Sequence, residues 1–387
     1  MKILFLVYHG FEEFSGISKK IHYQVKGLRE NGHDVHLCHY TIRDDGHRCR
    51  FVDDDIIQDY GKGFIAALRQ RVGYDCIYNY CIREKIEFVY ARCFQNANPW
   101  LIRFFKKLKK AGIHAVTEIP TYPYDAEFVG FPLMTRVNLK VDQIFRNALY
   151  KQMDAVITFS DAKEIFGQRT INISNGVDFD SIPLHEPLPM NHELHLIGVA
   201  EVHYWHGFDR LIAGLGEYYN NIKFKVPSSK FKEVIFHIVG GVGPSEMYDS
   251  MHAPGFYELI EKYGIKDHVI FHGTLFGKEL DDVFNQCLFA IGSLARHRSG
   301  ITNIKTLKNR EYATRGIPFI YSEQDTDFDH QPYALKAPAD ESPINIQQII
   351  DFVEAHQVNP ADIRKTVEQL SWKTQMQHVV DAVMSQS

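Results

Sequence analysis

Lysine and arginine side chains gather around one acidic residue in the second half of the chain. The basic residues are Arg296, Arg298, Lys305, Lys308, Arg310 and Arg315, and the acid is Glu311. Cations beside free backbone amides are suited to bind phosphate groups, and a carboxylate accepts hydrogen bonds from hydroxyl groups. A solvated helix face with i,i+3 and i,i+4 ion pairs would have the same composition. The residue types alone leave both interpretations open.

The position of this cluster favours an anion site. Residues 287–294, "CLFAIGSL", are typical of a buried strand, and a helix is expected to begin near Thr306 and to stop at Gly316. The first turn of a helix presents backbone N–H groups without internal partners. Amides at residues 306–308 would therefore bind a diphosphate, and Glu311, one turn further, would accept hydrogen bonds from two ribose hydroxyls. The pattern predicts a nucleotide site, with the solvated face as the alternative.

Short apolar runs alternate with helical stretches along the whole chain. Strands are expected at 2–8, 34–40, 86–93, 114–120, 154–160 and 169–176, and then at 194–201, 234–241, 267–275, 287–294 and 317–323. Continuous apolar runs are typical of parallel strands buried on both faces. Residues 180–193 contain three prolines and no periodicity, which predicts a linker. We therefore expect an α/β protein with two doubly wound, Rossmann-like domains facing a central cleft, residues 1–185 and 186–365.

Composition describes an ordinary globular protein. The 387 residues are enough for two domains, and the chain is 45% apolar and 24% charged. A net charge of −5 gives no general attraction to nucleic acid, so no nucleic-acid partner is expected. The six cysteines follow no CxxC pattern, which favours reduced thiols and a cytoplasmic location. No apolar run is long enough for a membrane span, and the N-terminal segment lacks a signal-peptide cleavage site.

Several segments together resemble the family-four retaining glycosyltransferases. "REYATRGIPFI" (310–320) is similar to their "EAMAxGxPVI" segment, with Glu311 at the second glutamate of the E-x7-E motif. The other landmarks are "SGISKK" (15–20), "ISNGVDFD" (173–180), "VHYWHGFDRLI" (202–212), "HIVGG" (237–241) and "VIFHGTLFGKELDDVF" (269–284). They follow the family's order over most of the chain. This version resembles a subgroup found among bacterial surface-polysaccharide enzymes.

The resemblance implies a GT-B fold and sugar transfer with retention of configuration, without a metal or cofactor. The donor would be a nucleoside-diphosphate sugar, with UDP preferred to GDP. The acceptor would be a glycan or lipid-linked sugar in capsule, exopolysaccharide or lipopolysaccharide synthesis. The last helix, within 366–387, would cross back to the first domain. The expected donor-binding residues are Gly16, His206, Gly273, Thr274, Leu275, Arg298, Lys305, Thr306, Leu307, Lys308 and Glu311, and the expected catalytic residues are Glu118, Asn303 and Glu311.

Three positions depart from the family pattern. Asn303 stands eight residues before Glu311, where the motif's first glutamate belongs, so it could bond a sugar hydroxyl but supplies no charge. Glu201 and His206 stand where the family has the arginine and lysine that face the diphosphate. The cations expected to neutralise the diphosphate instead are Arg298, Lys305 and Lys308.

On the acceptor side, Glu118 is the best acid available. It lies at the carboxyl end of a predicted strand, before the loop "PTYPYDAEF", and is expected to face the cleft, near the place where many relatives have a histidine. The alternative is a rigid turn, in which Pro120 and Pro123 fix the backbone and the tyrosines pack.

Two groups of metal-ligand residue types are not expected to bind metal. Asp53, Asp54 and Asp55 lie in a polar stretch that we interpret as a solvated loop or helix cap. The cluster "HDVHLCHY" (33–40) resembles a zinc site in composition. Alternation along a strand would, however, send its histidines and cysteine to opposite faces.

Residues 100–110 form a basic amphipathic helix. It could lie on an anionic membrane, which would place the protein at the inner face of the cell membrane, or it could face the core with a solvated basic side. Two other functions remain open. One is a nucleotide-sugar epimerase or hydrolase on the same frame. The other is a non-catalytic nucleotide-binding subunit of a glycosyltransferase complex.

Overall fold

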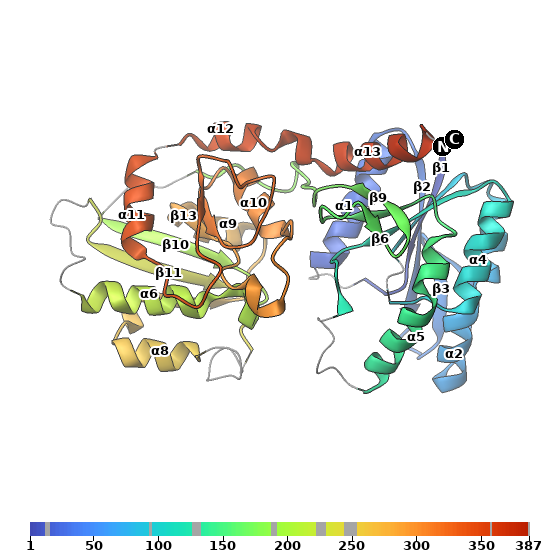
Figure 1. Ribbon diagram of the computed structural model, residues 1–387, viewed down its shortest axis with the longest axis horizontal. Coiled ribbons are helices and arrows are strands. Elements are labelled where there is room, and N and C mark those ends of the chain that lie inside the picture. The colour runs from blue at the N-terminus through green and yellow to red at the C-terminus, as the bar shows by residue number, and fades with distance from the viewer. Residues whose placement is uncertain are drawn as a thin grey trace. The chain divides into compact units, whose positions relative to one another are not determined.

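The computed structural model describes residues 1–11, 16–92, 95–125, 133–186, 192–221, 230–243, 254–356 and 358–385. The chain divides into two compact units (Figure 1). The N-terminal unit comprises Met1–Gly176 and Leu370–Ser387, and the C-terminal unit comprises Val177–Gln369. The change of unit therefore comes at Gly176, ahead of the predicted linker.

The N-terminal unit is built on one mostly parallel sheet with the order β4-β3-β2-β1-β5-β6-β7-β9-β8. Its strands are β1 (Lys2–Val7), β2 (Asp34–Ile42), β3 (Arg48–Val52), β4 (Asp55–Asp59), β5 (Phe88–Arg92), β6 (His114–Ile119), β7 (Ala155–Thr158), β8 (Glu164–Ile165) and β9 (Gln168–Asn172). Its helices are α1 (Gly16–Glu30), α2 (Gly63–Val72), α3 (Asp75–Arg83), α4 (Pro99–Lys110), α5 (Leu133–Tyr150) and α13 (Trp372–Met384).

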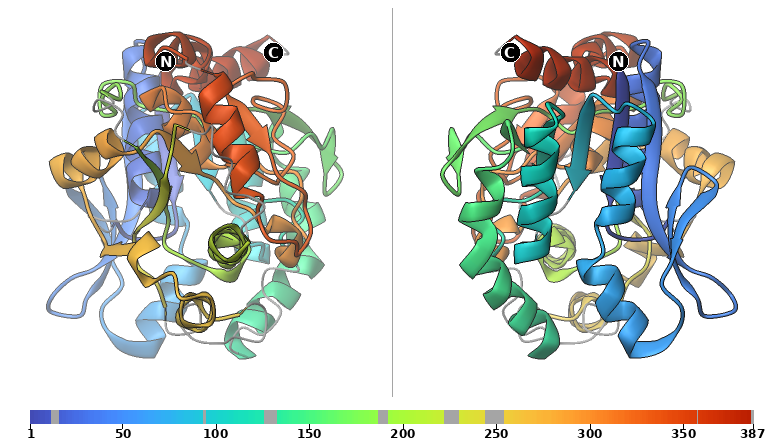
Figure 2. Two further views of the ribbon diagram at one scale, coloured as in Figure 1. Left: turned by 90° about the vertical axis from the view of Figure 1, so that its left-hand side faces the viewer. Right: turned by 90° about the vertical axis from the view of Figure 1, so that its right-hand side faces the viewer.

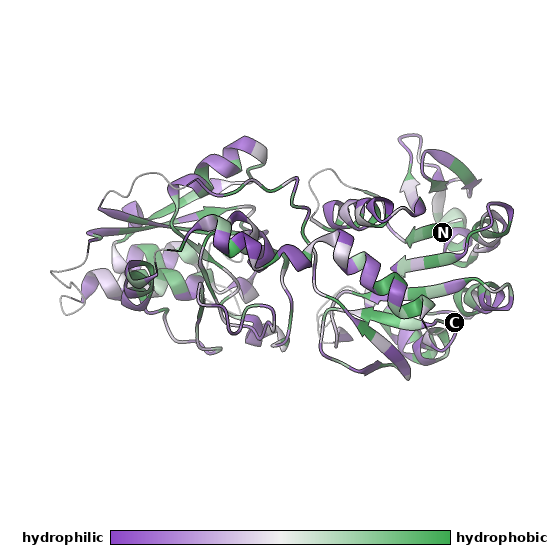
Figure 3. Cartoon of the chain, turned by 90° about the horizontal axis from the view of Figure 1, so that it is seen from above, coloured by the Kyte–Doolittle hydropathy of each residue, from purple (hydrophilic) through white to green (hydrophobic). Residues whose placement is uncertain are grey.

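Helices cover both faces of this sheet. Strand β1 alternates between them: Leu4 packs in a core with α3 and α4, and Phe5 packs in a second core with α1 and α13. Both side chains are fully buried, as the uninterrupted apolar run predicted. The helices of the first face stand in front of the strands in Figure 2, right. Figure 3 shows apolar residues along the strands and polar residues on the outer sides of the helices.

The C-terminal helix α13 belongs to the N-terminal unit. It packs along α1, and Met376 and Val379 share a core with Ile21. The indole of Trp372 closes this contact against Gly176, where an added Cβ would lie 2.4 Å from the ring. Only glycine leaves room for the indole at this position.

The stretch around Asp53 is a β-hairpin and not the expected solvated loop or helix cap. Strands β3 and β4 are antiparallel, and Asp53 lies in the turn between them with φ of 52°. Its carboxylate accepts the backbone N–H of Leu37 at 2.9 Å and lies 2.9 Å from Nδ1 of His36. The aspartate therefore fastens the turn to β2, since both oxygens have partners on that strand.

The C-terminal unit has a fully parallel sheet with the order β12-β11-β10-β13-β14-β15. Its strands are β10 (Glu193–Val199), β11 (Glu233–Val239), β12 (Val269–Gly273), β13 (Phe289–Ile291), β14 (Phe319–Tyr321) and β15 (Ala334–Lys336). Its helices are α6 (Phe208–Asn220), α8 (Phe256–Tyr263), α9 (Gly277–Gln286), α10 (Leu307–Arg315), α11 (Ile346–Ala355) and α12 (Pro360–Lys365). This is the strand order of the Rossmann fold.

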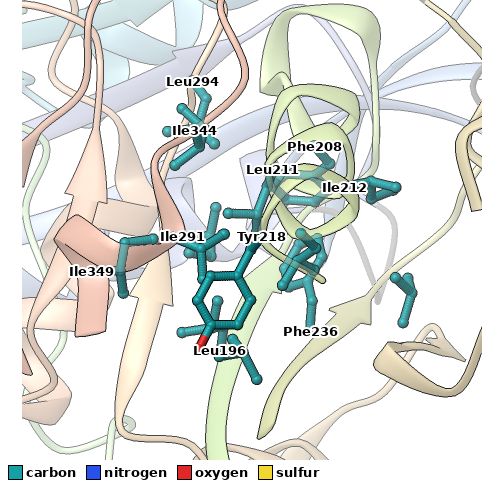
Figure 4. Close-up of a cluster of buried hydrophobic side chains, with 14 of the residues drawn as sticks. Leu196, Phe208, Leu211, Ile212, Tyr218, Phe236, Ile291, Leu294, Ile344 and Ile349 are labelled. Carbon is teal, nitrogen blue, oxygen red and sulfur yellow. The ribbon is translucent and has the colours of Figure 1, made fainter. Parts of the chain in front are cut away.

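The core of the C-terminal unit lies between the sheet and α6. Figure 4 shows Leu196 and Phe236 of the sheet beneath Phe208 and Leu211 of the helix, all fully buried. The predicted α/β class with two doubly wound parallel sheets is confirmed. The predicted helix at 306–316 is also confirmed, since α10 has Thr306 as its N-cap and Gly316 in the left-handed conformation at its C-terminus.

Three histidines on adjacent strands of this unit form a hydrogen-bonded chain. Nδ1 of His195 lies 2.7 Å from Nε2 of His237, whose Nδ1 lies 2.8 Å from Nε2 of His272. At the other end, Nε2 of His195 lies 3.1 Å from the Glu193 carboxylate. Because a carboxylate only accepts, each Nε2 carries a proton and donates along the chain. Burial, with the two neighbouring histidines, lowers the pKa of His237 to about 3.

Candidate functional site

The sheet of the C-terminal unit has its switch point between β10 and β13. From there the chain proceeds outward through β11 to β12 on one side and through β14 to β15 on the other. Doubly wound proteins bind ligands beyond the carboxyl ends of the strands at such a point. The loops that meet there are residues 200–207, after β10, and residues 292–306, after β13.

These two loops are packed tightly together. The backbone N–H of Leu294 donates to the carbonyl of His206 at 2.9 Å. Gly207 has φ of 67°, and an added Cβ would lie 2.9 Å from the Cβ of Ala295. A larger residue here would push the loops apart, which explains the glycine of "WHGFD".

Arg298 ties the two loops together. Its guanidinium donates to both carboxylate oxygens of Asp209, at 2.9 and 2.7 Å, and to the carbonyl of Tyr204 at 2.8 Å. It also donates to Glu341 at 3.0 Å, and only 6% of its side chain is exposed. Two carboxylates therefore already balance the charge that we expected to face a diphosphate. Its geometry is that of a structural clamp.

Lys308, in the first turn of α10, is a cation without such partners. Its Nζ is buried, has no hydrogen-bond partner among the described residues, and lies 5.6 Å from the centre of the Phe208 ring. Burial and then the charge of Arg296 lower the pKa of Lys308 to about 7, against a smaller opposing effect of Glu323. An anionic ligand would supply both the missing hydrogen bonds and the missing counter-charge.

His206 contributes a neutral ring to the same place. It is 6% exposed, and its Nδ1 accepts the backbone N–H of His203 at 2.9 Å. Burial holds the pKa of His206 well below its usual range, with further lowering by Lys308 and Arg296. The ring is therefore neutral, with its proton on Nε2, so it can donate one hydrogen bond but supplies no charge.

A pocket of about 320 Å³ opens at the carboxyl ends of β13 and β14. It is lined by Arg296, His297, Thr302, Ser322, Glu323, Gln324, Lys336, Ala337 and Ala339. Glu323 is 2% exposed and accepts a hydrogen bond from Asn309 at 3.1 Å, but its second oxygen has no partner in the part of the chain that the structure describes. Burial raises the pKa of Glu323, although the neighbouring Arg296 opposes this. The sequence reasoning missed Glu323, for which an acid directly after the apolar run "IPFIYS" was the available signal.

Other members of the basic cluster are held in internal ion pairs. Arg310 is fully buried and donates to Asp325 at 2.6 and 2.9 Å. Arg315 is 5% exposed and donates to Asp281 at 2.7 Å. The solvated-face interpretation is wrong for these arginines because their side chains are buried. The predicted anion site therefore has fewer available cations than the sequence suggested.

Glu311 lies on α10 at the far side of this network. Its side chain is 30% exposed and accepts a hydrogen bond from Arg315 at 3.1 Å. The predicted contact with a ribose would therefore compete with an existing ion pair. Leu307, the first residue of α10, is 40% exposed.

The residues just before α10 are joined to the chain after β14. Asn303 pairs with Gln324 through an isolated parallel bridge. The Nζ of Lys305 lies 3.6 Å from the carboxylate of Asp327. The hydroxyl of Thr306, the N-cap residue, donates to the carboxylate that lines the pocket, at 3.3 Å. Asn303 and Thr306 are therefore joined to residues that line the pocket, whereas the partner of Lys305 does not line it.

The loop expected to hold the base follows an edge strand. Gly273 ends β12 with φ of 67°, and its carbonyl accepts the backbone N–H of Gly240 at 2.7 Å. Thr274 is exposed and Leu275 is half-buried. Strands β11 and β10 separate β12 from β13, so these residues lie on the side of the switch point opposite β14.

Glu118, in the N-terminal unit, is fully buried and does not face an open site. It accepts hydrogen bonds from Tyr90 and Gln24, each at 2.6 Å, and lies 3.1 Å from both Lys20 and Arg92. Burial opposes ionisation, but the two cations and the hydrogen bonds lower the pKa of Glu118 to about 2. This carboxylate is therefore a fixed counter-ion inside the unit, and it lacks the access to substrate that the sequence suggested.

Gly16 is the first residue of α1 and is exposed. An added Cβ would meet no atom of the described residues within 4 Å, so none of these residues requires glycine there.

Helix α4 faces the core with its apolar side. Leu101, Phe104, Phe105 and Leu108 are buried, and the lysines lie largely on the opposite face, so the core-facing alternative is the observed one. In the part of the chain that the structure describes, no helix is long and apolar enough to cross a membrane. Within the same residues, no group of three or more histidine, cysteine, aspartate or glutamate side chains is arranged to hold a metal ion.

Comparison with solved structures identifies the fold. The chain is similar to sucrose-phosphate synthase from Thermosynechococcus elongatus, at 14% identity and a TM-score of 0.64, over 100% of both chains. It is similar to the lipopolysaccharide outer core galactosyltransferase WaaB, at 14% identity and a TM-score of 0.60, again over 100% of both chains. The catalytic domain of starch synthase IV from Arabidopsis thaliana, solved with ADP and acarbose, gives 12% identity and a TM-score of 0.60, over 99% of this chain and 98% of the other.

No protein-family model and no curated protein matches the sequence. At these identities the likeness concerns the fold. The chain has the GT-B fold of these glycosyltransferases, with a parallel-sheet α/β unit in each half.

Proposed function

We propose that the protein transfers a sugar from a nucleoside-diphosphate donor, and that the C-terminal unit binds the donor. The observation that carries this proposal is the buried, partnerless ammonium of Lys308, at a helix N-terminus beside the switch point of a Rossmann-type sheet. The ammonium of a lysine on a solvated surface would stay hydrated. A diphosphate would supply the charge that the site lacks.

The proposed roles follow from the geometry of the C-terminal unit. Lys308 and the α10 amides would bind the diphosphate, and Arg296 would face it from the pocket. His206 would donate one hydrogen bond from Nε2. Asn303, on the pocket border, would contact the donor sugar, and Glu311 would exchange its bond with Arg315 for bonds to the ribose. The loop 273–275 would contact the base.

In the proposed reaction an acceptor hydroxyl attacks the anomeric carbon as the bond to the diphosphate breaks, and the hydroxyl proton passes to the departing diphosphate. The protein's part is to position the reactants and stabilise the leaving charge. The motif resemblance supports retention of configuration, metal independence, a preference for UDP over GDP, and a family-four relationship. It also supports a role in bacterial surface-polysaccharide synthesis on a glycan or lipid-linked acceptor.

The same proposal places the protein in the cytoplasm, with peripheral contact at the membrane. Since the apolar face of α4 is used in the core, such contact through residues 100–110 would rest on exposed Trp100 and the basic side chains. It would therefore weaken as salt is raised.

Calorimetric titration with UDP, GDP, ADP and CMP, with and without Mg²⁺, tests the donor site. We expect one nucleoside diphosphate to bind without metal, and Lys308→Met to weaken it by about ten- to hundredfold, since hydrogen bonds to charged groups are worth about 1.5–3 kcal/mol. Lys278→Met is the control, because Lys278 is 85% exposed and pairs with Asp282 in the next turn of its helix. Failure of every nucleotide to bind would refute the proposal.

A second comparison tests Glu311 and the reaction type. If its carboxylate binds the ribose, wild type should prefer the nucleotide to its 2′-deoxy form, and Glu311→Gln should reduce that preference. Release of free sugar from the donor without an acceptor would instead indicate a hydrolase. Nucleotide binding without any turnover, across an acceptor panel, would indicate a non-catalytic subunit.

A further inference from the structure

A second cavity lies within the N-terminal unit, at the switch point of its own sheet. Parallel strands run outward from β1 to β2 on one side and from β5 onward on the other, and the cavity opens beside the ends of β1 and β5. Tyr8 and His9 border it directly after β1, and Arg92 ends β5. Its volume of about 430 Å³ suits a small molecule and exceeds what one inorganic ion needs.

The charges around this cavity all have the same sign. Arg50, Arg71 and Arg92 line it, and none of its lining residues within the described ranges is acidic. Tyr8, Tyr40 and Tyr74 supply aromatic rings beside the guanidinium groups. Three cations and aromatic walls describe a site for an anion attached to an organic body.

Two buried arginines and a glutamine at this cavity have hydrogen-bond donors without a partner among the described residues. Arg50 is 1% exposed; one guanidinium nitrogen donates to the carbonyl of Val7 at 3.1 Å, but Nε has no partner. Arg92 is 5% exposed, and its Nη1 has no partner. Gln95 adds another buried donor, Nε2, that is also without a partner. Leaving such groups unsatisfied is costly unless a ligand completes them.

The protein neutralises these cations only in part. Glu118 is shared by Arg92 and Lys20, so this buried group keeps an excess of one positive charge. Within the described residues, no carboxylate lies within ion-pair distance of Arg50. Because Glu118 holds the Arg92 guanidinium at the end of β5, it acts as a positioning residue for the cavity.

We propose that this cavity binds a phosphate-class oxyanion on the acceptor substrate, with Arg50 and Arg92 as its inner ligands. The inference rests on the glycosyl transfer proposed above and names its acceptor class. Guanidinium groups suit this role because their N–H groups match two oxygens of one phosphate. The phosphate could belong to a phosphorylated sugar or to the diphosphate of a lipid-linked sugar, and the ligands below distinguish these sources.

The test is calorimetric titration of the full chain with five probes. Methyl phosphate reports the shared chemistry, and glucose 6-phosphate and farnesyl diphosphate represent the two sources. Glucose is the uncharged comparison, and glucuronate is the carboxylate comparison. We expect methyl phosphate to bind, one of the two larger phosphates to bind at least tenfold tighter, and glucose to bind much more weakly. Equal affinity for glucuronate and glucose 6-phosphate would overturn the phosphate assignment, and so would no binding of methyl phosphate.

Substitutions locate the binding. Arg50→Lys and Arg92→Lys keep the charge but remove the guanidinium N–H groups that contact two phosphate oxygens. Each should weaken phosphate binding by about ten- to hundredfold. Because both positions are buried, Arg71→Gln on the exposed rim is the variant expected to fold without difficulty, with a loss of about threefold or more. Arg69→Gln, two residues earlier on the same helix and outside the cavity, should change nothing. Equal affinities of all four variants and wild type would overturn the inference.

The two proposals can fail separately. Nucleotide binding that depends on Lys308, without phosphate binding that depends on Arg71, would refute the acceptor inference and leave the donor site intact. The reverse result would refute the proposed function and leave an anion site in the N-terminal unit.

Discussion

Replacement of Lys308 by methionine should make the free protein more stable. The ammonium is buried beside Arg296 without a hydrogen-bond partner, and its pKa falls from the ordinary 10.5 to about 7. At about 1.4 kcal/mol per pKa unit, this difference corresponds to about 4 to 5 kcal/mol of unfavourable charge burial. Methionine has a similar length and no charge, so we expect the free energy of unfolding at pH 7 to rise by about 3 to 5 kcal/mol.

The pH dependence gives this prediction its sign. Since the folded pKa is the lower one, the unfolded chain binds more protons between pH 7 and 10.5, and the stability of the wild type should rise with pH across that window. The advantage of Lys308→Met should therefore be full at pH 7 and small at pH 10.5. Urea unfolding at a series of pH values measures both quantities. Lys278→Met, at an exposed ion pair, should shift stability by about 0.5 kcal/mol or less at either pH.

Two outcomes would refute this reasoning. Lower stability of Lys308→Met at pH 7 would mean that the ammonium has partners that offset its burial. An equal gain at pH 7 and pH 10.5 would mean that the gain comes from packing and not from charge. The expected combination, higher stability with weaker nucleotide binding, would mark a residue retained for its ligand.

Two further predictions concern buried titratable groups. The pKa of His237 is lowered to about 3, so near pH 6.5 the unfolded chain binds a proton that the folded chain does not bind. The free energy of unfolding should therefore fall as the pH drops below 6.5. In urea unfolding, His237→Phe should reduce this dependence on pH. Glu118→Gln should lower the free energy of unfolding by about 3 to 5 kcal/mol, because Lys20 and Arg92 then share a buried site without a counter-charge. Lys20→Met combined with Glu118→Gln should recover part of the loss, and an additive loss in the double variant would contradict the ion-pair account.

The sequence was sufficient for the features that depend on local pattern. Apolar runs predicted the parallel strands, and the N-cap Thr306 with Gly316 predicted both ends of α10. The sequence was not sufficient where the role of a side chain depends on partners that are remote along the chain. Arg298 was expected to be available to a ligand because its partners Asp209 and Glu341 are remote in sequence. The ion pairs of the other arginines in the cluster were not predicted for the same reason.

The sequence pattern also did not predict the edge strands or the burial of charged side chains. Strands β3 and β4 contain charged residues among their apolar ones and pair at the edge of the sheet, so they resemble a polar loop in sequence. The acidity of Glu118 was visible, but its burial among Lys20, Arg92 and Tyr90 depends on α1 and β5 meeting β6. The structure therefore makes Glu118 the buried counter-ion of Lys20 and Arg92, in place of the predicted group in contact with substrate.

The position of α13 has a consequence for synthesis of the chain. Residues 177–369 form the C-terminal unit from one continuous segment, whereas the N-terminal unit combines Met1–Gly176 with Leu370–Ser387. While the ribosome is still adding residue 369, Ile21 and Val25 of α1 lack the apolar partners Met376 and Val380. The N-terminal unit therefore cannot be completed before residues 370–385 are made, and until then the apolar face of α1 stays open to chaperones and proteases.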